Sequence, residues 1–194
     1  LAAQEVVRNQ VLTLTNGCVW ERDYVPITLG EERHGHLWLY RDVTERMRAQ
    51  EALQLNTERI ETLLRLNQMR EASFEAIMDF ALEAAVRLTR SEIGYLALTN
   101  EDETVLTMKA WSKTVMEECA IPGKPQVYPL ETTGLWGEAV RQRRPIVTND
   151  YAAPNPWKKG YPDGHVALHR HANVPIFSGD HIVMVAGVAN KAYD

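Results

Sequence analysis

The 194-residue sequence predicts an α+β protein, with an antiparallel sheet of five to six strands flanked by helices in its second half. The first observation is a series of short apolar, β-branched segments separated by turn residues, which is typical of antiparallel strands. The second is a stretch without proline or glycine, residues 44–91, which has helical periodicity. The third is a smaller group of strand-like segments before it, so a partial antiparallel sheet is expected to precede a long linking helix.

A turn at Asn16-Gly17 is the clearest signal near the start of the chain. Both residues tolerate positive φ and lie between apolar, β-branched segments, which favours a hairpin. A strand with a period of two is predicted over residues 19–26, which places Trp20 and Tyr24 on one of its two faces.

A third strand, HGHLWLYRDV, follows a second turn at residues 30–33, and residues 1–10 are predicted to be the end of a helix. Three strands without a covering helix make a poor independent domain. Their aromatic residues would otherwise form a large exposed apolar patch, so we expect the strands to pair with a second copy or to lie on the helix.

The helical stretch has two parts. In its first part, an apolar and amide stripe has heptad-like spacing, formed by Leu53, Asn56, Ile60, Leu63 and Asn67. This pattern predicts a short parallel coiled coil and hence a homodimer, with asparagine fixing the register. The alternative is a single amphipathic helix that packs on its own domain. Beyond about residue 71 the apolar face widens, which predicts packing against a sheet.

The remaining segments alternate between strands and helices. A hairpin is predicted first, across the acidic turn at residues 100–103, and another is predicted last, across Ser178-Gly179-Asp180. Between them we expect, in order, a short helix at 112–119, a loop, a helix with a glycine-bearing start at 133–141, a short strand at 145–149 and a long loop at 150–164.

Composition excludes several classes of function. The net charge of −5 gives no basic surplus for a phosphate backbone, so nucleic acid is not an expected partner. No apolar stretch is long enough to cross a bilayer, so no direct membrane contact is expected in this part of the protein. Cys18 and Cys119 fall in different predicted domains, and reduced thiols in the cytoplasm are the simpler interpretation.

Residues before the helical stretch resemble the C-terminal half of a PAS domain. The matching segments are Asn16 to Ile27, Gly35 to Trp38 and Arg41 to Arg46, and they include the Asp42-Val43-Thr44 element that leads into a signalling helix. The interpretation has a physical basis, since Thr44 can cap the helix while Asp42 pairs with a nearby arginine. The resemblance divides the chain into a partial PAS domain at 1–46 and a signalling helix at 47–70.

Residues 71–194 resemble a GAF domain without its C-terminal helix. The matching segments are Gly134 to Gly137, Arg144 to Asp150, Val174 to Phe177 and Val185 to Lys191. The PAS–helix–GAF order is similar to the sensory half of a bacterial or archaeal histidine kinase. The resemblance implies a sensory module that binds a small molecule, or else a ligand-free dimerisation module. It gives no reason to expect a catalytic domain here.

Aromatic and histidine residues of the 150–171 region are the main candidates for ligand contact, because a binding site needs apolar walls with a few orienting polar groups. The candidates in this region are Tyr151, Trp157, Tyr161, His165 and His169, and two tryptophans that precede it, Trp111 and Trp136, complete the set. Glu138 is a further candidate, although it can instead pair with Arg141, three residues along the same helix face. Lys158 and Lys159 would suit an anionic ligand or remain solvated.

The cofactor is not determined by the sequence, but haem or another tetrapyrrole is possible, because it needs only one axial histidine or cysteine. Cys119 and His165 are the candidate ligands. The series His165, His169 and His171 lacks a diagnostic carboxylate, so no metal site is expected. The enzymatic alternative, a thiol-dependent GAF-fold reductase, would have Cys119 alone and would need an external reductant.

Overall fold

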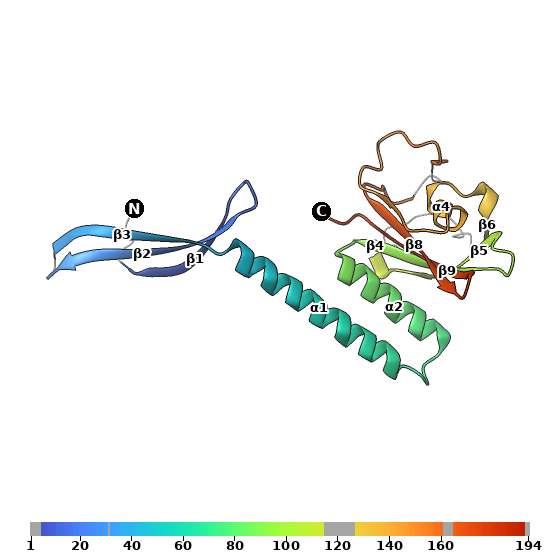
Figure 1. The fold of residues 1–194 in the computed structure, drawn as a ribbon, viewed down its shortest axis with the longest axis horizontal. Helices are drawn as coiled ribbons and strands as arrows, with labels where there is room; N and C mark the ends of the chain where they lie inside the picture. Colours follow the sequence, from blue (N-terminus) through green and yellow to red (C-terminus); the bar gives the residue numbers. More distant parts are fainter. Residues whose placement is uncertain (1–4, 31, 115–126, 161–164, 193–194) are drawn as a thin grey trace. The chain divides into compact units, whose positions relative to one another are not determined.

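The computed structural model describes residues 5–30, 32–114, 127–160 and 165–192. The chain divides into two units, Leu1–Glu58 and Arg59–Asp194. The first contains a three-stranded antiparallel sheet and the second a six-stranded antiparallel sheet with helices (Figure 1). The predicted α+β class is therefore confirmed. None of the described helices has the length and apolar character needed to cross a membrane.

The sheet of the first unit has the order β1-β2-β3, with β1 at Val7–Thr13, β2 at Val19–Leu29 and β3 at Glu32–Asp42. Gly17 takes a φ of 79° in the predicted turn, a backbone conformation that glycine adopts without strain. The prediction of a helix over residues 1–10 is wrong from Val7 onward. Strand β1 pairs there with β2 instead, and Gln10, for example, lies opposite Arg22.

One face of this sheet carries a ladder of aromatic rings. Tyr24 lies opposite Trp38, with ring centroids 4.7 Å apart, and Tyr40 stacks on Trp38 at 6.4 Å. The guanidinium of Arg22 lies 4.7 Å from the centroid of Trp38. Trp38 and Tyr40 are 39% and 51% exposed. The expectation that another surface covers these strands stays a prediction.

The joint between β3 and the next helix is built from two side chains. Asp42 accepts hydrogen bonds from the backbone N–H of Thr44 at 2.9 Å and from its hydroxyl at 2.6 Å. The Thr44 hydroxyl oxygen also accepts from Val19 N–H of β2. Asp42 therefore locks the strand-to-helix joint, as predicted, and the positive charge of Arg48 acts on its carboxylate. The predicted cap role of Thr44 is wrong, because Asp42 accepts the hydrogen bond at the helix start and Thr44 ties that start to the sheet. The same hydrogen bonds from Thr44 lower the pKa of the Asp42 carboxyl.

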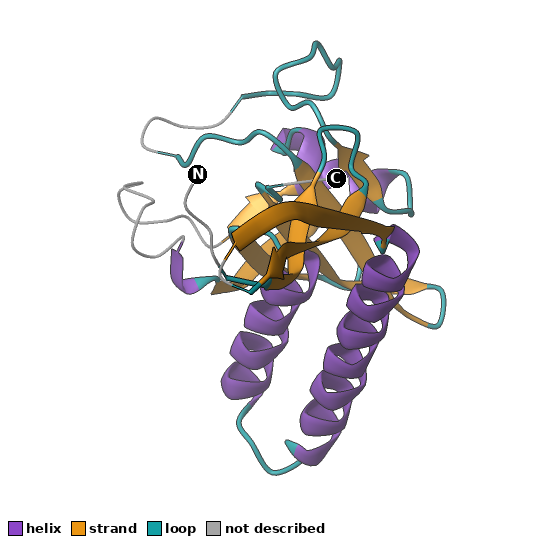
Figure 2. Cartoon of the chain, turned by 90° about the vertical axis from the view of Figure 1, so that its left-hand side faces the viewer, coloured by secondary structure: helices purple, strands orange, loops and turns teal. Residues whose placement is uncertain are grey.

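The predicted helical stretch forms two helices, α1 at Thr44–Gln68 and α2 at Phe74–Thr89, and not one. The break has a local cause, because the Ser73 hydroxyl accepts a hydrogen bond from Ala76 N–H and caps a new helix. In the second unit, the last turns of α1 lie beside α2 (Figure 2). Arg87 there donates to Thr62, and Arg65 lies over the ring of Phe80.

The sheet of the second unit has the order β6-β5-β4-β9-β8-β7, and all of its neighbours are antiparallel. Its strands are β4 at Ile93–Thr99, β5 at Val105–Trp111, β6 at Val127–Pro129, β7 at Ile146–Thr148, β8 at His171–Ser178 and β9 at His181–Ala189. Both predicted hairpins are confirmed. β6 lies where a loop was predicted, and the predicted helix at 112–119 falls largely outside the described residues.

Helix α2 covers one face of this sheet through Met78 and Leu82, which pack against Leu96 and Ala110. Gly94 permits this approach, because a Cβ there would lie 2.7 Å from a methyl group of Val86.

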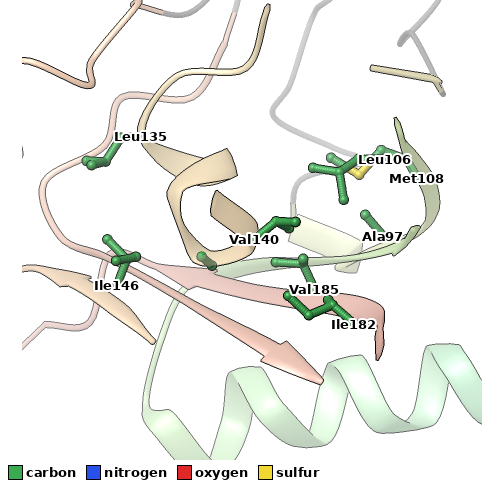
Figure 3. Packing of buried hydrophobic residues seen from close by; sticks show 9 residues of the cluster. Ala97, Leu106, Met108, Leu135, Val140, Ile146, Ile182 and Val185 are labelled. Carbon is green, nitrogen blue, oxygen red and sulfur yellow. The ribbon is translucent and has the colours of Figure 1, made fainter. Parts of the chain in front are cut away.

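The opposite face is covered by the short helices η1 at Leu130–Thr132, η2 at Leu135–Gly137 and α4 at Glu138–Arg141. Ala139 and Val140 of α4 pack there against Val185 and its neighbours (Figure 3). The predicted helix at 133–141 thus forms with a 3₁₀ start. It places Trp136 on the sheet face away from α2.

Candidate functional site

A hydrogen bond crosses three strands on the sheet face away from α2. Tyr95 on β4, Gly187 on β9 and Asn173 on β8 lie in one row of the sheet. The Tyr95 hydroxyl donates to Oδ1 of Asn173 at 2.9 Å, over the top of Gly187. A Cβ on Gly187 would lie 2.1 Å from Cε1 of Tyr95 and 2.5 Å from that oxygen. The glycine is therefore what allows the two side chains to meet.

Asn173 connects this row to the covering helix and to His171. Its Nδ2 donates to the carbonyl oxygen of Trp136 at 3.0 Å and lies 2.6 Å from Nε2 of His171. Asn173 is fully buried, and His171 is only 5% exposed. The Nδ1 atom of His171 is buried, and no residue in the described part of the chain hydrogen-bonds to it, which is a costly arrangement for a polar atom.

Burial keeps these groups uncharged. It lowers the pKa of His171 to about 4, against the opposing effect of the Asn173 hydrogen bond. Burial also raises the pKa of the Tyr95 phenol far above its usual value. Both side chains are consequently neutral at neutral pH, so the row presents hydrogen-bonding groups without formal charge.

Aromatic rings surround the row. Trp136 meets Tyr95 edge to face at 5.8 Å, and Trp111 lies 6.2 Å from Tyr95. Tyr151 meets the imidazole of His171 edge to face at 6.0 Å. The structure thus brings three of the predicted ligand-contact residues, Trp111, Trp136 and Tyr151, to this face of the sheet.

Other predicted contact residues lie elsewhere. The Trp157 side chain is 51% exposed, while its backbone passes over Gly134. His169 is exposed and precedes β8, so it does not share a strand face with His171. Nδ1 of His165 lies 2.6 Å from the carbonyl oxygen of Val166. Two further predictions, Tyr161 and the proposed haem ligand Cys119, lie outside the described residues.

Charged candidates in this region already have partners. Glu138 pairs with Arg141, as predicted, but it is 1% exposed and not on the surface. Arg141 also donates to the carbonyl oxygens of Thr133 and Gly134, so the pair holds η2 and α4 in place. Lys158 donates to carbonyl oxygens of its own loop, and its ammonium lies 4.7 Å from the centroid of Tyr151.

The central members of the site were not on the sequence-derived list of binding residues. Tyr95, Asn173 and His171 come from strands that are separated by up to 78 residues in the chain. The signal that was available is Gly187, because a glycine inside an apolar strand often marks a close approach of other groups.

Comparison with known proteins agrees with this architecture. The family model described as GAF domain matches residues 71–194. The chain belongs to the GAF domain family. The family resemblance predicted for this segment is therefore confirmed.

Relatives of this GAF protein include a methyl sulfide methyltransferase-associated sensor of Methanosarcina acetivorans, which is 58% identical over 151 residues. The match covers 78% of the chain but 15% of that sensor, so the chain spans a small part of its relative.

Two solved structures share the fold. The GAF domain of a phosphoenolpyruvate-protein phosphotransferase from Coxiella burnetii has a TM-score of 0.53 and 16% identity, covering 68% of this chain and 77% of its own. The free methionine-R-sulfoxide reductase from Neisseria meningitidis, solved with its substrate, has a TM-score of 0.53 and 15% identity. The match covers 73% of this chain and 79% of the reductase. At these identities the likeness concerns the fold alone.

Proposed function

We propose that this chain is the sensory part of a cytoplasmic signal-transduction protein, and that its GAF domain binds a small molecule on the sheet face away from α2. The observation that carries the proposal is the buried Nδ1 of His171, to which none of the described residues hydrogen-bonds, in an imidazole that meets the ring of Tyr151 edge to face. A buried polar atom of this kind costs free energy unless a bound molecule or water satisfies it.

The covering segments suit a sensing role. The carbonyl oxygen of Trp136 in η2 is bonded to Asn173, and Tyr151 N–H donates to His169 carbonyl in the loop before β8. A molecule that contacts His171 would therefore touch groups that hold both η2 and this loop. Its binding would shift the balance between arrangements of these segments.

The relay would run through the helices. Helix α2 packs on β4 and β5, the strands that carry Tyr95 and Trp111. Arg87 and Phe80 of α2 contact the last turns of α1. We propose that α1 pairs with a second copy through its predicted stripe and carries the signal toward a histidine kinase output, and that residues 1–46 are the C-terminal part of a PAS domain.

Native mass spectrometry of the purified chain, with its absorption spectrum, tests ligand binding. The proposal predicts that the native mass exceeds the denatured mass by that of a retained molecule. His171→Met should lose this molecule, and the exposed control His169→Met should keep it. Equal native and denatured masses, also after incubation with cell extract, would support a ligand-free dimerisation module.

The same spectrum tests the tetrapyrrole alternative. A haem would give an intense visible absorption that His165→Ala or Cys119→Ser removes, since either residue is a candidate axial ligand. A colourless protein with a retained mass would exclude it.

We propose regulation and not catalysis for this GAF domain. The enzymatic alternative is a thiol-dependent reductase that uses Cys119. Free methionine sulfoxide and a thiol reductant provide the assay, with Cys119→Ser as the control. Turnover that disappears in this variant would contradict the regulatory proposal.

A further inference from the structure

The hydrogen bonds around Asn173 fix which ring nitrogen of His171 carries the proton. A backbone carbonyl can only accept a hydrogen bond, so the Asn173 atom 3.0 Å from the carbonyl oxygen of Trp136 must be the amide nitrogen. The other amide atom is then the oxygen, which is consistent with the hydrogen bond from the Tyr95 hydroxyl. The orientation of the Asn173 amide follows from these two neighbours and not from His171.

The tautomer of His171 follows from this orientation. The second hydrogen of the Asn173 amide nitrogen points to Nε2 of His171 at 2.6 Å, so Nε2 is the acceptor. Because the imidazole is neutral, its single proton must then be on Nδ1. The buried Nδ1 atom, which finds no acceptor among the described residues, is therefore an N–H donor that requires one.

We propose that Nδ1–H of His171 donates a hydrogen bond to the bound ligand, which is an uncharged, aromatic or conjugated molecule with an oxygen or ring-nitrogen acceptor. This inference rests on the proposed function and adds the chemical class of the ligand. The flat ring of Tyr151, whose centroid lies 6.0 Å from that of His171, favours a flat molecule, and the donor requires an acceptor on the edge of that molecule.

Charge argues against an anion at this position. Lys158, the cation next to Tyr151, already donates to two carbonyl oxygens of its own loop. Arg141 is paired with Glu138 and with the carbonyls of η2. A carboxylate bound beside the neutral His171 would lose its hydration without gaining a cation, which is unfavourable.

The first test measures the tautomer in the free protein. In ¹⁵N NMR of histidine-labelled chain at neutral pH, Nδ1 of His171 should give the shift of a protonated ring nitrogen and Nε2 that of an unprotonated one. His171→Met identifies the signals. The reverse assignment, or a charged ring, would overturn the proposal whether or not any ligand binds.

The second test uses three probes of similar size in calorimetry: quinoline, naphthalene and 2-naphthoate. Quinoline carries a neutral ring-nitrogen acceptor, naphthalene carries none, and naphthoate is an anion. We expect quinoline to bind roughly tenfold more tightly than naphthalene, the advantage of one buried hydrogen bond. Naphthoate should bind most weakly.

Variants show whether His171 is responsible. The preference for quinoline should fall to about unity in His171→Met, whose side chain has no donor, and persist in the exposed control His169→Met. Equal binding of quinoline and naphthalene by the wild-type chain would contradict this inference but leave small-molecule binding intact. No binding of any probe would count against the inference and the proposed function together.

Discussion

Gly187 determines whether the site can form, because Tyr95 and Asn173 meet directly above it. In Gly187→Ala the new methyl group would overlap the Tyr95 ring and the Asn173 amide, and both are held by neighbouring strands. We expect the free energy of unfolding of the GAF domain to fall by about 3 kcal/mol, as for an overpacked core. Denaturant unfolding followed by tryptophan fluorescence measures this.

Gly35 provides the matched control. It also lies in a strand, but a Cβ there would meet no atom within 4 Å. Gly35→Ala should leave the unfolding of the GAF domain unchanged. A loss below about 0.5 kcal/mol in Gly187→Ala would mean that the row across β9 is not tightly packed.

His171 should make the stability of the GAF domain depend on pH. Its pKa is about 4 in the folded chain and 6.5 in an unfolded one, so the unfolded state takes up the proton first as the pH falls. Wild-type stability should therefore drop by about 2 kcal/mol between pH 7 and pH 5 from this residue.

The measurement is the difference between the wild-type chain and His171→Met, because other histidines and carboxylates also titrate in this range. The variant should lose this part of the pH dependence. Parallel curves for the two proteins would show that His171 takes up its proton as readily in the fold as in water.

At the scale of elements, the joint between β3 and α1 depends on the Thr44 hydroxyl, which links Asp42 to Val19. Thr44→Val keeps the shape of the side chain and removes the hydrogen bonds of its hydroxyl to Asp42 and to Val19 N–H. The free energy of unfolding of this unit should therefore fall by about 1 kcal/mol. Hydrogen exchange at the Val19 amide should become faster, since that N–H loses its acceptor. Thr57→Val, on the exposed surface of α1, is the control and should not alter this amide.

Helix α1 leaves its predicted stripe exposed, with Leu53 at 67%, Ile60 at 59% and Leu63 at 64%. If two copies pair through this stripe, Asn56 and Asn67 lie in the interface, where asparagine lowers stability. The double variant Asn56→Leu/Asn67→Leu should then have a dimer dissociation constant at least tenfold lower than that of the wild-type chain, as measured by sedimentation equilibrium.

The control for the helix pair is Glu51→Leu, which adds an apolar side chain on the opposite side of α1. It should leave the dissociation constant unchanged. If Glu51→Leu strengthens the dimer as much as the double asparagine variant does, the contact is non-specific and hydrophobic, which would argue against a defined coiled coil.

Elements were predicted well where local patterns determine them. The two hairpins of the GAF sheet follow from alternating apolar residues and turn residues, and the structure has both. The break between α1 and α2 was missed because residues 44–91 contain no proline or glycine, although serine, as at Ser73, favours a helix cap over a helix interior. β6 was missed because its three residues pair only through contact with β5.

At the scale of the whole molecule, the sequence indicated the family and the general region of the site but not its centre. Tyr151 and Trp136 were identifiable as aromatic residues near a long loop. His171 was identifiable only as one histidine of the 150–171 region. Asn173 was not identifiable, because its importance comes from strand order, which places Tyr95 two strands away. Asn173 and His171 are buried because both faces of the sheet are covered, and residues next to them in the sequence do not reveal this.

The central claim is that a small molecule completes the hydrogen bonding of His171, and a crystal structure of the purified chain tests it most directly. The account predicts density for a bound molecule with an oxygen or nitrogen atom at hydrogen-bonding distance from Nδ1, beside the Tyr151 ring. An ordered water or a protein group that accepts from Nδ1 in its place would contradict the account.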